Sequence, residues 1–127
     1  MSCPEDILVP VSVGELMDKI SILEIKAERI KDPGPLKNIE RELAALRAVR
    51  IHYPAALASL VAELKRVNGE LWNIEDDIRD CEARNDFGEF FIELARTVYR
   101  LNDERSRIKR AINVGAGSRL QEEKSHR

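Results

Sequence analysis

The residues of this chain whose types and spacing suggest chemistry are basic and amide side chains, most of them towards the C-terminal end. Arg105 occupies a position within an apolar repeat, and Asn68 and Asn102 are expected on the flanks beside it. A guanidinium offers two parallel donors to a carboxylate or a phosphate. These features predict an anion-binding site, for which the candidates are Arg96, Asn68, Asn102, Arg105, Lys109 and Arg110.

The same residues also have a purely structural interpretation. Arg105 can extend to the edge of a helical bundle or pair with Glu63, and such a polar group fixes the register of an apolar seam at some cost in stability. Basic residues near the C-terminal end of a helix also complement its dipole. A stabilised Arg105→Leu variant with intact function would support this interpretation over the anion site.

Acidic residues dominate positions 70–82, where six carboxylates accompany a single arginine, so that the local charge is −5. Glu75 and Arg79 stand four residues apart in the order that stabilises a helix, which favours a solvated charged surface. The alternative is a magnesium site that includes Glu75 and Asp76, because hard cations prefer carboxylate oxygens. We expect no cofactor on the first interpretation and magnesium on the second.

Other kinds of catalytic or metal site find no support in the sequence. His52 and His126 have no nucleophile beside them, and the paired Glu-x-x-His motifs of di-iron bundles are absent. Cys3 and Cys81 share no zinc-ligand or disulfide spacing with each other or with the histidines. Cys81 instead fits the apolar repeat as a small seam residue.

Length and charge exclude several further classes. The 127 residues include 21 basic and 23 acidic side chains, for a net charge of −2. A single domain of this size can bury a core without disulfides or metals. The near-neutral charge argues against a chain-wide surface for nucleic acid, and no apolar stretch reaches the ~18 residues that span a bilayer. We therefore expect a cytoplasmic protein that neither inserts into membranes nor binds nucleic acid.

Apolar residues recur at alternating intervals of three and four along most of the chain, which is the spacing of amphipathic helices. The clearest run extends from Leu57 to Cys81, and a second from Phe87 to Ile112 is interrupted only by Arg105. Short turns between the runs make neighbouring helices antiparallel. The sequence therefore predicts an all-α four-helix bundle of two antiparallel helical hairpins, the longer one coiled-coil-like, with helices at about residues 13–31, 36–50, 54–84 and 86–113.

Local signals mark the ends of these helices. Ser12 and Glu15 have the spacing of a capping box, and Asp32–Pro35 breaks the apolar pattern. A second break at His52–Pro54 places its proline in the first turn of the third helix, and Asp86 is the capping candidate for the fourth. We therefore divide the chain into an N-terminal arm, one helical-bundle domain and a flexible or docked C-terminal tail, at residues 1–12, 13–113 and 114–127.

The two predicted hairpins differ in length. Helices of about 28 residues extend about 42 Å, whereas the shorter arms reach only about 24 to 28 Å. The short hairpin cannot cover the long one, so apolar residues outside the seams require another partner. We expect a homodimer, and the residues that motivate this expectation are Ile22, Ile25, Trp72, Ile92 and Tyr99.

The chain resembles a small bacterial family of all-helical proteins that is known as a domain of unknown function. The resemblance covers nearly the whole chain and rests on three blocks, Pro-Val-Ser-Val-Gly-Glu-Leu at 10–16, Leu-Trp-Asn-Ile-Glu-Asp at 71–76 and Ile-Lys-Arg-Ala-Ile-Asn at 108–113. The chain departs from the family pattern at His126, where an aromatic residue is usual. The resemblance implies an all-helical protein without an assigned reaction.

Two functional interpretations from different classes remain open. We favour a non-enzymatic assembly or binding module that presents a charged flank to a protein partner or to a small anionic metabolite. The alternative is a small all-helical enzyme acting on a phosphorylated or carboxylated metabolite. In the enzyme, Arg96, Arg105 and Lys109 would neutralise the anion, and Glu75 or Asp76 would hold magnesium or act as a base.

Overall fold

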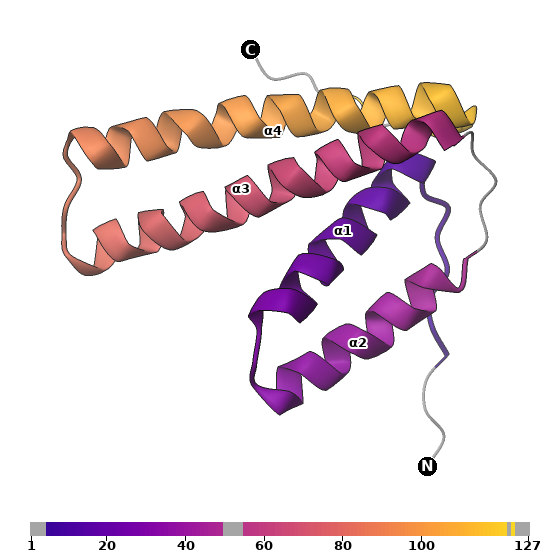
Figure 1. Ribbon diagram of the computed structural model, residues 1–127, viewed down its shortest axis with the longest axis horizontal. Coiled ribbons are helices and arrows are strands. Elements are labelled where there is room, and N and C mark those ends of the chain that lie inside the picture. Colours follow the sequence, from indigo (N-terminus) through magenta and orange to yellow (C-terminus); the bar gives the residue numbers. More distant parts are fainter. Residues whose placement is uncertain (1–4, 50–54, 122, 124–127) are drawn as a thin grey trace.

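The computed structural model describes residues 5–49, 55–121 and 123, and this part of the chain is helical without any strand. The predicted all-α fold is confirmed. His52–Pro54, Cys3 and His126 lie outside the described residues, as do residues 122, 124, 125 and 127 of the predicted tail. The elements are α1 (Val13–Arg29), α2 (Pro33–Arg47), the 3-10 turn η1 (Ala55–Leu57), α3 (Ala58–Ala83) and α4 (Glu89–Ala116) (Figure 1).

Helix α2 begins earlier than the sequence analysis predicted, at Pro33 rather than near residue 36. Asp32 caps it, because its Oδ1 accepts a hydrogen bond from the Gly34 N–H at 3.3 Å. Prolines in the first turn of a helix remove amides that would have no intrahelical partner, so Pro33 and Pro35 are compatible with this start. The segment that looked like a break is therefore a helix beginning.

Helix α4 begins later than predicted, at Glu89 rather than near residue 86, and continues to Ala116. Asn85 adopts a left-handed conformation (φ 54°), and the Asp86 Oδ1 accepts from the Gly88 N–H at 3.2 Å. The carboxylate that was expected to cap the helix thus stabilises the turn before it. Phe87 consequently precedes the helix, where its ring meets that of Phe91 edge-on, with centroids 5.3 Å apart.

Helix α1 is the central element of the fold, since it contacts α2, α3 and α4, whereas α2 contacts only α1 among the described helices. Figure 1 shows the α1–α2 hairpin crossing one end of the long α3–α4 hairpin. The arrangement is a four-helix bundle in which α2 is displaced outwards from the other three helices. Its core lies at the covered end and includes Leu16, Met17, Leu64, Val67, Leu101, Ile108 and Ile112.

The start of α1 lies directly against α4. Ser12 caps α1 by accepting from the Glu15 N–H at 3.0 Å, as the capping spacing predicted. The Gly14 N–H donates to the Asn113 Oδ1 at 2.6 Å. A Cβ on Gly14 would lie 2.5 Å from the Lys109 backbone oxygen, so only glycine permits this approach of the two helices.

Beyond the end of α1, the long hairpin continues as a two-helix extension that we call the distal arm, residues 74–100 (Figure 1). At the end of α1, Arg29 donates a hydrogen bond to Asn73 of α3. Large apolar side chains in the distal arm are about half exposed: Phe87 at 49%, Phe90 at 54%, Ile92 at 51% and Tyr99 at 54%.

Candidate functional site

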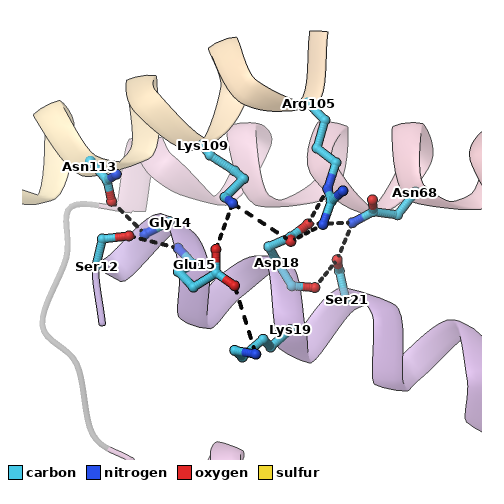
Figure 2. A network of polar contacts seen from close by, with 10 residues as sticks. All are labelled: Ser12, Gly14, Glu15, Asp18, Lys19, Ser21, Asn68, Arg105, Lys109 and Asn113. Carbon is cyan, nitrogen blue, oxygen red and sulfur yellow. Dashed lines mark hydrogen bonds and ion pairs between the residues drawn. The ribbon is translucent and has the colours of Figure 1, made fainter. Parts of the chain in front are cut away.

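A buried carboxylate, Asp18 of α1, lies at the centre of a polar network between α1, α3 and α4 (Figure 2). Its side chain is only 2% exposed. The Asp18 carboxylate accepts hydrogen bonds from Arg105 through Nε, at 2.9 Å, and through Nη2. It also accepts from the Asn68 Nδ2 at 2.9 Å. Three helices therefore meet at a single charged group.

This pairing satisfies the electrostatic demand of both charges. A buried carboxylate needs a cation and hydrogen-bond donors to offset its lost hydration, and the Arg105 fork supplies both. Hydrogen bonding to Asp18 raises the pKa of Arg105 above its ordinary value, while partial burial acts in the opposite direction. Because the pKa rises on folding, this contribution to stability is present below the ordinary arginine pKa and is lost only at still higher pH.

Asn68 extends the network to the backbone of α1. Its Nδ2 donates to the Ser21 Oγ at 2.8 Å as well as to Asp18. The Ser21 hydroxyl in turn donates to the Asp18 backbone oxygen at 2.8 Å. All three residues are buried, so these hydrogen bonds fix how α1 sits on α3.

A second ion pair lies one turn nearer the start of α1. The Lys109 Nζ is 2.6 Å from the Glu15 Oε2 and 3.9 Å from the Asp18 Oδ2 (Figure 2). Lys19 approaches the other Glu15 oxygen at 3.8 Å. The predicted anion-site residues Asn68, Arg105 and Lys109 are thus brought together, and the anions that they bind are carboxylates of the chain itself.

The remaining basic candidates lie on the surface, away from the network. Arg96 is exposed and is 3.7 Å from Glu93, one turn before it in α4. Arg110 is also exposed, and its Nη1 is 3.1 Å from a Glu123 carboxylate oxygen. Neither arginine shares a partner with Arg105 in these contacts.

The acidic candidates lie on the exposed side of α3 in the distal arm. Glu75 has a carboxylate oxygen 3.8 Å from Arg79, and Asp76 is exposed beside it. Across the described residues, no three histidine, cysteine or acidic side chains are grouped so that they could hold a metal ion. The magnesium interpretation therefore gains no geometric support from these two residues.

An open hollow of about 210 Å³ adjoins the network where α1 ends. Arg105 and Asn102 contribute polar groups to it, and Trp72 forms part of its apolar wall. The Arg29 guanidinium lies 5.8 Å from the centre of the Trp72 ring. The residues that line the hollow are Ile22, Ile25, Asn68, Leu71, Trp72, Glu75, Asn102 and Arg105.

Sequence reasoning identified Arg105 as a charge in need of a partner but missed Asp18. Glu63 was the expected partner, yet it pairs with Arg66 at 3.0 Å. The available signal was the Glu15-x-x-Asp18 spacing, which places two carboxylates one turn apart at the start of the first predicted helix. That spacing alone did not indicate which of its carboxylates would be buried.

The described part of the chain contains no helix that is both long enough and apolar enough to cross a bilayer. In comparisons with known proteins, the model of one family, described as a family of unknown function (DUF6165), matches residues 7–127. No curated protein and no solved structure matches the chain. The match confirms the resemblance to an uncharacterised family that the sequence motifs indicated.

Proposed function

The chain belongs to DUF6165, a family of unknown function, and we propose that it is a non-enzymatic assembly module that pairs with a second copy of itself through the distal arm. The observation that carries this proposal is the unequal covering of the long hairpin. One end is buried beneath α1, while the other presents large apolar side chains to solvent.

One side of α4 makes the contrast explicit. Tyr99, Asn102 and Lys109 follow at intervals of three and seven residues, so they share one side of the helix. The α1 helix reaches this side at Lys109, whose ammonium binds Glu15. It does not reach Tyr99, which is 54% exposed. The side that packs on α1 at one end is therefore available to another partner at the other end.

The apolar residues are numerous enough to favour association. Ile92 and Tyr99 are two turns apart on the same side of α4, and both are more than half exposed. Burying one large apolar side chain contributes about 1.5 to 3 kcal/mol. Exposed patches of this kind mark interaction surfaces in proteins that otherwise have a well-formed core.

Charge complementarity supports a second copy of the chain as the partner. The α3 part of the distal arm is strongly acidic, with the exposed Asp77 and Asp80 among its residues, whereas the α4 part has as many basic as acidic side chains and exposes Arg96 and Arg100. In a two-fold pairing, each surface of one protomer meets the other surface of its partner. Opposite charges then come together twice across the interface.

Sedimentation velocity at several protein concentrations tests this proposal. We expect the unaltered chain to dimerise and the Ile92→Glu/Tyr99→Glu double variant to be monomeric, with a dimer dissociation constant at least about 100-fold higher. Glutamate favours helix and both positions are exposed, so the fold should persist. Circular dichroism and thermal unfolding of the double variant check that it does.

A matched control is Val114→Glu, because Val114 is also exposed on α4, at 65%, but lies at the covered end of the hairpin. This variant should dimerise as well as the unaltered chain. Added salt should weaken dimerisation, since the opposed charges are exposed. An unaltered chain that stays monomeric at about 100 µM, or equal effects of the control and the double variant, would refute the proposal.

A further inference from the structure

The hollow at the end of α1 combines an apolar wall with both hydrogen-bond donors and hydrogen-bond acceptors. Its volume of about 210 Å³ is less than that of pockets for drug-sized ligands. A hollow of this size suits a small organic molecule. Ile22, Ile25, Leu71 and Trp72 provide the apolar surface on one side.

Two side chains at the hollow retain hydrogen-bond donors. Arg105 binds Asp18 through Nε and Nη2, which leaves its Nη1 without a hydrogen bond to the described part of the chain. Asn102 is half-buried, and its amide has no hydrogen-bond partner in the same part of the chain. A ligand carboxylate can accept from both, because a guanidinium edge and an amide N–H suit its two oxygens.

Two other side chains at the hollow offer acceptors. Glu75 is anionic and its nearest cation, Arg79, is 3.8 Å away on an exposed surface. Asn68 uses its Nδ2 for Asp18 and Ser21, so its carbonyl oxygen is left as an acceptor. An ammonium group has three donors and no acceptor, which is the complement of the Glu75 carboxylate.

The charges around the hollow disfavour a simple anion. The Arg105 charge is already balanced by Asp18, and Glu75 pairs with Arg79 at 3.8 Å on an exposed surface, so the hollow has no excess positive charge to offer a simple anion. A phosphate dianion would be repelled by Glu75, whereas a molecule with one positive and one negative group keeps the balance. We propose that this hollow binds a small zwitterion with an apolar side chain, which is the chemistry of a free apolar amino acid.

Intrinsic fluorescence provides a direct test, because Trp72 is the single tryptophan of the chain and lines the hollow. The probes are L-leucine, L-valine and L-phenylalanine, and at least one should change the emission saturably. The amide of that amino acid lacks the carboxylate, and its deaminated acid lacks the ammonium group. Each should bind at least about tenfold more weakly, as should inorganic phosphate.

Matched variants assign the effect to the hollow. Glu75→Gln should weaken binding of the amino acid by about tenfold, whereas Glu82→Gln should leave it unchanged. Both residues are exposed acids on α3, but only Glu75 lines the hollow. Asn102→Ala removes a hydrogen-bond donor for the ligand carboxylate. It should therefore weaken binding of the amino acid more than binding of its amide, which has no carboxylate.

Repeating the titration with the Ile92→Glu/Tyr99→Glu variant separates this inference from the proposed dimer, since neither residue lines the hollow. Binding should persist in that variant. The inference is wrong if none of the three amino acids gives a saturable change, if phosphate or the amide binds as tightly as the amino acid, or if Glu75→Gln and Glu82→Gln behave alike.

Discussion

The two ends of the α3–α4 hairpin have the same apolar repeat but different surroundings. At the covered end, α1 lies on the hairpin, and the seam residues Leu64 and Val67 have no exposed surface. In the distal arm the seam residues Cys81 and Leu94 are also buried, but Phe90 and Tyr99, which lie beside the seam, are each 54% exposed. Helix periodicity alone therefore predicts which side of a helix faces its neighbour, but not whether a third element covers the pair.

The polar residues also differ between the two ends of the hairpin. At the covered end, Asp18, Asn68 and Asn113 are buried and hydrogen-bonded. In the distal arm the charged side chains are exposed and pair with neighbours on the same helix, such as Glu75 with Arg79. The covered end gains its specificity from buried polar groups, whereas the distal arm keeps apolar surface for contacts outside the protomer.

The largest expected effect is that of Arg105→Leu. The sequence alone suggested that this change could stabilise the protein, but it would leave the buried Asp18 without its cation. We expect the free energy of unfolding to fall by about 3 to 5 kcal/mol in urea titrations. Arg100→Leu, in the exposed distal arm, should change it by less than about 0.5 kcal/mol.

The double variant Asp18→Leu/Arg105→Leu sharpens this comparison. Replacing both partners of a buried ion pair by apolar groups of similar size is often tolerated. The double variant should therefore recover most of the stability that Arg105→Leu loses. A single Arg105→Leu variant as stable as the unaltered chain would show that the covered end does not depend on this pair.

An intermediate effect is expected for Gly14→Ala. The added methyl group would lie 2.5 Å from the Lys109 backbone oxygen and 2.9 Å from the Asn113 Oδ1, so α1 must move away from α4. We expect a loss of about 1 to 3 kcal/mol in the free energy of unfolding. Thermal and urea unfolding measure it.

Gly69→Ala is the matched control. Gly69 lies in α3, the helix that runs from the covered end into the distal arm. The nearest side-chain atom to the added methyl group would be the Arg29 Nη2 at 3.9 Å, so the methyl group fits. Alanine is the better helix former, and this variant should gain about 0.5 to 1 kcal/mol. If both glycine variants were stabilised, the close approach at Gly14 would not limit how α1 packs.

The smallest effect is expected for Lys65→Met, which tests an exposed counterpart of the Asp18–Arg105 pair. Lys65 also joins α3 to α1, with its Nζ 2.9 Å from Glu28 and 3.8 Å from Glu24. Exposed pairs contribute about 0.2 to 1 kcal/mol, and salt screens them. A loss comparable to that of Arg105→Leu would mean that burial does not distinguish the two connections.

The sequence predicted the helices well because their apolar spacing is regular, and it placed the start of α1 at the correct residue. The α3 helix begins at Ala58 rather than near residue 54, after the 3-10 turn η1. The starts of α2 and α4 were also misplaced, because Asp32 and Asp86 act differently. Both carboxylates accept from the amide two residues later, but the helix begins immediately after Asp32 and only at Glu89 after Asp86. Local residue types do not distinguish a capped helix from a turn that precedes one.

The candidate site was predictable only in part. Arg105 stood out because it interrupts an apolar run within its own helix. Asp18 did not, because its burial depends on α1 crossing α4 closely at Gly14, which no local pattern encodes. The hollow was equally hidden, since it forms where the path of α1 ends beside Trp72 and Asn102.

The distance along the chain between Asp18 and its cation also has a consequence for biosynthesis. Arg105 follows Asp18 by 87 positions, so a ribosome adding about 5 to 20 residues per second needs about ten seconds to supply it. During that interval the carboxylate remains hydrated on the nascent chain. The first two helices can pair with each other as they emerge, but they must wait for the last helix before the protein can complete its interior.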